Sequence, residues 1–172
     1  SKVSSGNVKL VMRKIVIVEL VCQTGGGYNG KFEDKELTIV TMLPRQAVYI
    51  WSDGRHLYRV IENLYNNVAK YALQKTRVYV EVQADEERAV FSIKNVSARS
   101  LARENSEVED LTERFIRGDS SRTTEGSGLG LSIAKNLTLL MGGMFDISVD
   151  GDLFKATIAL PLYVEGQEER GQ

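Results

Sequence analysis

The alternation of apolar and polar residues along the chain predicts a mixture of strands and helices. Period-two alternation and enrichment in β-branched residues are typical of strands. We place strands at residues 8–12, 37–43, 47–51, 77–82, 88–93, 144–149 and 153–160. The pair over 77–82 and 88–93 is expected to form a hairpin, and so is the last pair, which flanks Asp150-Gly151-Asp152.

Helical periodicity marks three other stretches. Residues 15–23 are mostly apolar and predict a short helix, whose continuation is weakened by the glycines at 25–27. Asp53 is a favourable N-cap for a longer helix of about five turns. Its apolar residues recur at helical spacing: Leu57, Val60, Ile61, Leu64 and Val68. A third helix begins near Leu131 and ends at Gly142-Gly143.

This order of elements predicts one α+β domain. We expect a two-layer α/β sandwich, in which a mixed, mostly antiparallel sheet carries helices packed on one face. The 172 residues, 42% hydrophobic and 26% charged, suit a single soluble domain. No apolar run approaches the roughly 20 residues that span a bilayer.

Charge and residue usage exclude several kinds of site. The formal net charge of −1 gives no reason to expect nucleic acid or direct membrane contact. Cys22 is the only cysteine and His56 the only histidine. An internal disulfide and any metal site that needs several such side chains are therefore absent.

A glycine-rich stretch over residues 126–131 reads Gly-Ser-Gly-Leu-Gly-Leu and leads directly into the third helix. Glycines let an anion approach the backbone amides, and a helix N-terminus adds unpaired N–H groups. A bound phosphate is one interpretation. A dinucleotide-binding turn and a packing turn are the alternatives, although the preceding residues lack the strand that a dinucleotide fold requires. No P-loop motif is present.

Three polar residues share one face of the predicted helix that follows Asp53. Asn63, Asn67 and Lys70 are spaced four and three residues apart. Asparagine is a mediocre helix former, so its repeated use here needs a reason. One interpretation is a row of ligands for a hydrated cation and for phosphates, and the other is a solvated helix face.

Three stretches in order carry a resemblance to a known family: Glu62–Tyr71, Leu111–Arg122 and Gly126–Leu131. They resemble the N, F and G2 boxes of the ATP-binding catalytic domain of bacterial sensor histidine kinases. That domain belongs to the wider GHKL group, which is shared with gyrase, Hsp90 and mismatch-repair ATPases. The resemblance covers roughly residues 37–161. It implies the Bergerat fold, with a mobile ATP lid over about residues 98–125.

The resemblance also implies a role for each matching residue. Asn67 would ligate Mg²⁺, Asn63 would lie near the magnesium shell or the γ-phosphate, and Lys70 would contact phosphate. Tyr71 would stack on the nucleotide or hydrogen-bond near it. The phosphates of ATP would be wrapped by Gly126, Ser127, Gly128, Leu129, Gly130 and Leu131. In the lid, Phe115 would be a hydrophobic anchor, while Arg117 and Arg122 are either phosphate ligands or ordinary solvated charges.

The sequence departs from the family pattern at the adenine position. Where the family has Asp-x-Gly-x-Gly, this chain has Asn95 and neither glycine. An amide oxygen still accepts a hydrogen bond from the adenine amino group, but without the charge-assisted component. We therefore expect weaker or altered nucleotide binding. The final Gly-Thr element of the family is also replaced, here by residues 152–157.

A second departure bears on the reaction. The ATPases of the group use a Glu as general base, and this chain has Asn63 there, which takes no proton at neutral pH. Glu62 points about 100° away around the helix. Phosphoryl transfer to a delivered nucleophile is therefore expected rather than hydrolysis. Nothing around His56 resembles the phosphoacceptor motif, so we interpret His56 as structural and expect the accepting histidine to lie outside this chain.

The resemblance implies how the chain is organised and what it meets. We expect residues 1–7 to be a linker from an upstream dimerisation and phosphoacceptor domain, residues 8–163 the catalytic domain, and residues 164–172 a disordered charged tail. That upstream domain and a response regulator receiver domain are the implied partners. The domain would be cytoplasmic, with its parent protein anchored in the bacterial inner membrane. The chain alone should bind Mg·ATP without phosphorylating itself.

Two other functions remain open. A serine kinase of the anti-sigma type shares this fold and these boxes but needs no dimerisation helices. A pseudokinase-like module would signal through protein contacts without binding nucleotide, and the altered region at Asn95 is the feature that favours it.

Overall fold

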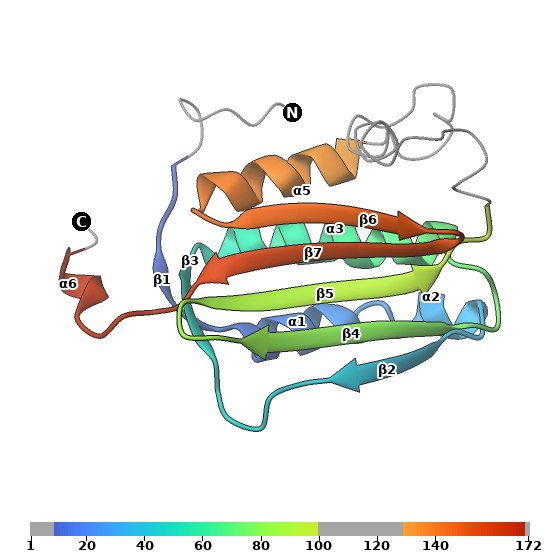
Figure 1. The fold of residues 1–172 in the computed structure, drawn as a ribbon, viewed down its shortest axis with the longest axis horizontal. Helices are drawn as coiled ribbons and strands as arrows, with labels where there is room; N and C mark the ends of the chain where they lie inside the picture. The colour runs from blue at the N-terminus through green and yellow to red at the C-terminus, as the bar shows by residue number, and fades with distance from the viewer. Residues whose placement is uncertain (1–8, 100–128, 171–172) are drawn as a thin grey trace.

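A five-stranded sheet with helices on one face forms the domain in a computed structural model that describes residues 9–99 and 129–170 (Figure 1). The strand order is β2-β4-β5-β7-β6. Their bounds are β2 Thr38–Met42, β4 Arg77–Ala84, β5 Arg88–Val96, β6 Met144–Asp150 and β7 Leu153–Pro161. Only β2 and β4 pair in parallel, and the other neighbours are antiparallel. The predicted two-layer, mostly antiparallel sandwich is confirmed.

The two predicted hairpins are present. β4 pairs with β5 from Val78 opposite Asn95 to Ala84 opposite Ala89, and β6 pairs with β7 across the turn at Gly151. Alternate residues of these strands are buried against the helices, as their sequence pattern requires. The pattern therefore fixed which face of each strand enters the core.

A separate two-stranded sheet joins β1 (Arg13–Val16) to β3 (Tyr49–Ser52). The strand predicted over residues 8–12 is wrong, because the chain becomes a strand only where it lies opposite β3. Val11 is 51% exposed and belongs to no strand. The chain after β7 joins this small sheet, since Leu162 forms a bridge to Ile50 and the amide of Tyr163 donates to the carbonyl of Tyr49 at 2.9 Å.

The helices of the second layer are α1 (Ile17–Gly26), α2 (Asn29–Asp34), α3 (Gly54–Tyr71) and α5 (Leu129–Leu140). Helix α1 continues through Gly25 and Gly26, further than predicted. Helix α2 was not predicted, because its six residues are polar apart from one buried side chain, that of Phe32. A short helix α6 (Gln167–Arg170) also forms where we expected a disordered tail, and Gln167 Oε1 accepts from the amide of Val164 at 2.9 Å.

The turn after α5 needs both of its glycines. Gly142 has φ +84°, a conformation that side chains with a Cβ rarely adopt. A Cβ on Gly143 would lie 2.4 Å from the carbonyl oxygen of Ala159 on β7. The predicted helix end at this pair is confirmed, and the structure adds close backbone packing as its cause.

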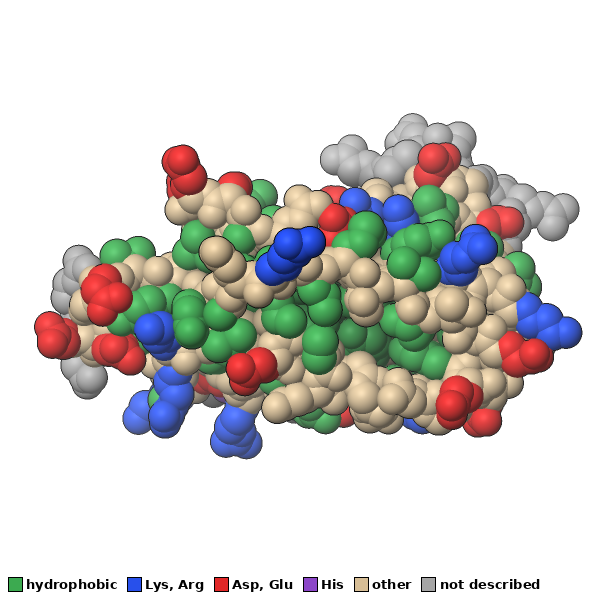
Figure 2. Space-filling view, turned by 90° about the horizontal axis from the view of Figure 1, so that it is seen from below, with side chains coloured by type: hydrophobic (Ala, Val, Ile, Leu, Met, Phe, Trp, Pro, Cys, Tyr) green, Lys and Arg blue, Asp and Glu red, His purple; other side chains and the backbone are tan. Residues whose placement is uncertain are grey.

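The core lies between the sheet and α3. The buried face of α3 consists of Leu57, Val60, Ile61, Leu64, Tyr65 and Val68. It meets the inward-facing residues of β4, β5 and β7 and the buried side of α5. Figure 2 views the domain from its β2 edge, where hydrophobic side chains form a central band and charges of both signs are scattered around it.

Candidate functional site

Helix α3 carries the predicted asparagine face and is held at its start by Asp53. The Oδ1 atom of Asp53 accepts a hydrogen bond from the amide of His56 at 3.1 Å, which confirms the predicted N-cap. Asn63 and Asn67 lie half-buried on the same helix, and Lys70 is exposed. Because the apolar face of α3 enters the core, these three side chains lie toward the edge of the helix layer rather than inside it.

The first turn of α5 meets this asparagine face. An ideal Cβ on Gly130 would lie 3.5 Å from Oδ1 of Asn63 and 3.7 Å from its Cγ. The structure therefore places the last glycine of the glycine-rich stretch directly beside Asn63, and Leu131 is buried in the core next to it. Two sequence motifs that lie more than sixty residues apart thus contact each other.

Asn95 is the predicted site residue that lies on the sheet, on β5. It is the penultimate residue of β5 and continues the inward-facing row of that strand, in register with Val78 on β4 and Phe154 on β7. Its side chain is 2% exposed. Its Nδ2 donates to the carbonyl of Val96 at 3.2 Å, whereas its buried Oδ1 has no hydrogen-bond partner within the described chain.

An unpartnered buried oxygen is rare in folded proteins and calls for an explanation. Asn95 belongs to the end of β5 that lies beside the end of α3. The amide of Leu73 donates to the carbonyl of Val96 at 2.8 Å, and the amide of Ala98 donates to the carbonyl of Tyr71, also at 2.8 Å. The end of β5 and the end of α3 are therefore tied together. A buried acceptor without a donor among the described residues suits a ligand that brings a hydrogen-bond donor.

A lysine that sequence reasoning missed supports the end of α3. Lys35 Nζ donates to the carbonyls of Lys70 at 3.1 Å and of Ala72 at 3.3 Å. Cations are favourable at a helix C-terminus because they neutralise its unpaired carbonyls. Burial lowers the pKa of Lys35. No sequence signal links Lys35 to α3, since the contact depends on how the turn after α2 packs.

An aromatic cluster supports α3 from behind the asparagine face. Tyr65 stacks on Tyr28 with ring centroids 5.8 Å apart, and it also contacts Phe32 and Phe91. Its hydroxyl donates to the carbonyl of Val21 at 3.2 Å, and burial raises the pKa of Tyr65 strongly. These contacts tie α3 to α1, α2 and the sheet, so the helix is a rigid support for the residues on its other face.

Several predicted site residues lie outside the described part of the chain. They are Phe115, Arg117, Arg122, Gly126, Ser127 and Gly128, together with the expected lid. Leu129 is placed as the first residue of α5. The residues that the structure does bring together are Asn63, Gly130 and Leu131 from the helices. Tyr71 and Asn95 lie at the joined ends of α3 and β5.

The donors present fit Mg²⁺ only if most ligands come from elsewhere. Within residues 9–99 and 129–170, no group of three or more His, Cys, Asp or Glu side chains could hold a metal ion. Mg²⁺ is commonly held by one or two protein oxygens, with phosphates and waters as the other ligands. The amide oxygens on the asparagine face of α3 suit that arrangement.

Comparison with known families identifies the domain. A family described as "Histidine kinase-, DNA gyrase B-, and HSP90-like ATPase" matches residues 52–164, which include α3, β5 and α5. The chain belongs to this family. Membership of this ATPase family supports nucleotide binding by the domain.

Curated relatives of this ATPase domain are sensor histidine kinases. Sensor histidine kinase WalK of Bacillus subtilis is 29% identical over 140 residues, which are 80% of this chain and 23% of WalK. Sensor histidine kinase RppB of Synechocystis is 32% identical over 121 residues, which are 67% of this chain and 26% of RppB. The chain therefore spans about a quarter of the length of these relatives.

Solved structures show the same fold. The catalytic domain of histidine kinase ThkA superposes with a TM-score of 0.75 at 16% identity, covering 88% of this chain and 98% of ThkA's. The mycobacterial sensor histidine kinase MprB gives 0.72 at 21% identity, covering 88% and 98%. The helices described in the ATPase domain include none long and apolar enough to cross a membrane.

Proposed function

We propose that this domain binds Mg·ATP and presents the γ-phosphoryl group for transfer to a histidine on an upstream dimerisation and phosphoacceptor domain. The phosphoryl group would then pass to an aspartate of a response regulator receiver domain. The family relationship supports nucleotide binding. The observation that carries the proposal is the buried Oδ1 of Asn95, which has no hydrogen-bond partner among the described residues and belongs to the joined ends of β5 and α3.

Asn95 would select the base. Its amide is held in one orientation, because turning it over would bring Oδ1 within 3.2 Å of the carbonyl of Val96. Two acceptors at that distance repel each other, so Oδ1 stays directed away from Val96. An amino group, such as the 6-amino group of adenine, would satisfy it, whereas the 6-oxo group of guanine would not.

The helices would hold the phosphates and the metal. Asn67 would supply an amide oxygen to Mg²⁺, which neutralises charge on the phosphates when bound. Asn63 would orient the same region against Gly130, where the backbone approaches without a Cβ. Lys70 would add positive charge, Tyr71 would contact the nucleotide, and the backbone of residues 126–131 would surround the phosphates. Arg117 and Arg122 are further candidates for contact with phosphate.

The side chains on α3 favour transfer over hydrolysis. No carboxylate occupies the Asn63 position, so an attacking water has no general base there. Glu62 is the nearest acid along the helix, and its carboxylate accepts from the hydroxyl of Tyr58 at 3.2 Å, one turn toward the start of α3. Catalysis would then rest on positioning and on neutralising charge.

The accepting histidine must come from elsewhere. His56 lies in the first turn of α3, with its Nδ1 3.0 Å from Oδ1 of Asp53. His56 and Asn63 are seven residues apart on α3, a rise of about 10 Å. His56 is therefore a partner of Asp53 and not a phosphoacceptor. The proposal includes the expectation that the chain alone does not phosphorylate itself. The parent protein would be anchored in the bacterial inner membrane, with this domain in the cytoplasm.

Calorimetric titration with ADP and with a non-hydrolysable ATP analogue, with and without Mg²⁺, tests the proposal. Asn67→Ala should abolish the magnesium-dependent part of binding. Asn66→Ala is the matched control, since it makes the same change on the same helix about 100° away around the axis. Binding that is equally sensitive to both substitutions would contradict the role given to Asn67.

The same titration separates the alternatives. Absence of binding at millimolar nucleotide would favour an interaction module that lacks nucleotide, with the glycine-rich stretch serving packing alone. Binding by this chain, followed by phosphorylation of a serine on an added substrate, would favour a serine kinase. Phosphorylation of a histidine-bearing helical domain supplied in trans would support the histidine kinase reaction.

A further inference from the structure

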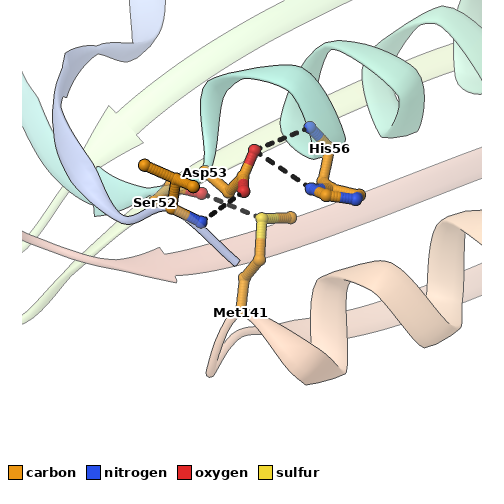
Figure 3. A network of polar contacts seen from close by, with 5 residues as sticks. Ser52, Asp53, His56 and Met141 are labelled. Atoms are coloured by element: carbon orange, nitrogen blue, oxygen red, sulfur yellow. Dashed lines mark hydrogen bonds and ion pairs between the residues drawn. The ribbon is translucent and has the colours of Figure 1, made fainter. Parts of the chain in front are cut away.

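Ser52, the last residue of β3, and Asp53, which precedes α3, contact three separate segments of the chain (Figure 3). Asp53 is 4% exposed, and its carboxylate has three close partners. Oδ2 accepts from the backbone amide of Val11 at 2.7 Å. Oδ1 accepts from the amide of His56 at 3.1 Å and lies 3.0 Å from Nδ1 of the same residue. One buried carboxylate thus joins the segment that enters the domain to the first turn of α3.

The preceding residue makes a contact with the other helix of the site. Ser52 is fully buried, and its hydroxyl donates to Sδ of Met141 at 3.1 Å. Met141 directly follows α5, and its amide donates to the carbonyl of Leu137 at 3.1 Å. Ser52 and Asp53 therefore hold the start of α3 and the end of α5 at one point, which we call the junction.

The nucleotide-binding residues lie toward the other ends of the same two helices. Helices α3 and α5 pack against each other. Gly130, in the first turn of α5, lies beside Asn63, about 14 Å along α3 from the junction. A helix transmits displacement along its axis because its backbone hydrogen bonds make it stiff. A shift at the junction therefore changes how Asn63 and Gly130 face each other.

We propose that Asp53 is a positioning residue that links the backbone at Val11 to the two helices of the nucleotide site. Through this link, displacement of the entering segment changes nucleotide affinity. The inference rests on the proposed function, because it takes the site at Asn63 and Gly130 to be the nucleotide site.

The burial of Asp53 explains why the link is tight. A carboxylate out of contact with water needs hydrogen-bond donors, and losing one is costly. If Val11 moves away, Oδ2 loses its donor and Asp53 must move toward water. Asp53 also caps α3, so its movement pulls on the amide of His56. Ser52 is its neighbour in the chain, so the contact with Met141 is disturbed as well.

Val11→Pro removes the donor, because proline has no N–H. Val11→Ala is the matched control, since it changes the same exposed side chain and keeps the amide. We expect Val11→Pro to weaken binding of Mg·ADP by about fivefold or more, the lower range of coupling between sites. Val11→Ala should bind as the unchanged chain does. Equal affinity of the two variants would overturn the proposal.

A double-mutant cycle separates positioning from general destabilisation. Asp53→Ser keeps an N-cap, since serine caps helices well, but is too short to reach Val11. Val11→Pro should therefore weaken binding much less in the Asp53→Ser background than in the unchanged chain. Full additivity of the two effects would show that Val11 acts by another route and would refute the link.

Amide hydrogen exchange without nucleotide gives a readout that does not depend on the proposed function. Val11→Pro should speed exchange in the first turns of α3 and at the amide of Met141, and Val11→Ala should not. If the unchanged chain fails to bind ADP, the proposed function fails while this exchange pattern still decides whether Asp53 positions the helices. Unchanged exchange in both regions would overturn the positioning role.

Discussion

Replacing Asn95 with leucine should make the domain more stable and a worse nucleotide binder. Asn95 is 2% exposed, and its Oδ1 has no hydrogen-bond partner among the described residues. Leucine has similar size and shape but no polar atoms. Asn95→Leu therefore removes a buried unsatisfied oxygen from the free protein and, at the same time, the acceptor proposed to bind the base.

The size of the stability change follows from the neighbouring hydrogen bonds. An unpaired buried polar group costs about 1–3 kcal/mol. The substitution also removes the bond from Nδ2 to Val96, a loss of about 0.5–1.5 kcal/mol. The carbonyl of Val96 keeps its bond from the amide of Leu73 at 2.8 Å, so no new unpaired group is created. The net gain is about 1 kcal/mol, equivalent to about 2–4 °C in Tm for a domain of this size.

Urea denaturation and calorimetric titration with Mg·ADP measure the two effects on the same samples. We expect the free energy of unfolding to rise and the affinity to fall by tenfold or more, about 1.4 kcal/mol. Asn136→Leu on the exposed side of α5 is the control and should change neither by more than about 0.5 kcal/mol. A clear loss of stability in Asn95→Leu would show that Oδ1 is satisfied in the folded protein and would refute the reasoning.

Two further predictions concern the fold around the site. Gly143→Ala should lower the free energy of unfolding by about 3 kcal/mol in urea denaturation, since its Cβ would lie 2.4 Å from the backbone oxygen of Ala159 and the β6–β7 pairing must shift. Burial raises the pKa of Asp53, but hydrogen bonds from the amides of Val11 and His56 and from the His56 ring outweigh this and lower it. The stability that Asp53 contributes is therefore present above its unfolded pKa of about 3.9 and is lost as pH falls through its folded pKa. In denaturation series from pH 7 to 3, the difference in free energy of unfolding between the unchanged chain and Asp53→Asn should therefore shrink.

Local sequence rules were sufficient for most of the fold. The alternation in β4, β5 and β7 predicted both the strands and their buried faces, because each strand has one face on the core. Asp53 predicted the start of α3 because capping needs only the next turn. The failures are short elements whose existence depends on a distant partner. β1 forms where it meets β3, and α2 is ordered mainly by the burial of Phe32.

For the site, spacing predicted the residues but not their environment. The interval between Asn63 and Asn67 placed them on one helix face from the sequence alone. Gly130 lies against Asn63 because α5 packs on α3. Local sequence patterns do not predict this tertiary contact. The support of α3 by Lys35 and the environment of Asn95, whose oxygen has no partner among the described residues, also depend on tertiary packing. The sequence therefore predicts candidate roles, and the structure adds the burial and contacts of those site residues that it describes.

Two buried polar side chains, Asp53 and Asn95, differ in the hydrogen-bond donors that the described residues supply to them. Asp53, at the junction, accepts hydrogen bonds from the backbone amides of Val11 and His56. Asn95, at the opposite end of α3, has an oxygen that the described residues leave without a donor. Burial is unfavourable for both polar groups. Hydrogen bonds to the carboxylate of Asp53 offset it, whereas Oδ1 of Asn95 accepts none from the described residues. A buried oxygen that lacks a donor among the described residues and lies at the end of β5 joined to α3 is consistent with the proposed ligand, which would supply the missing donor.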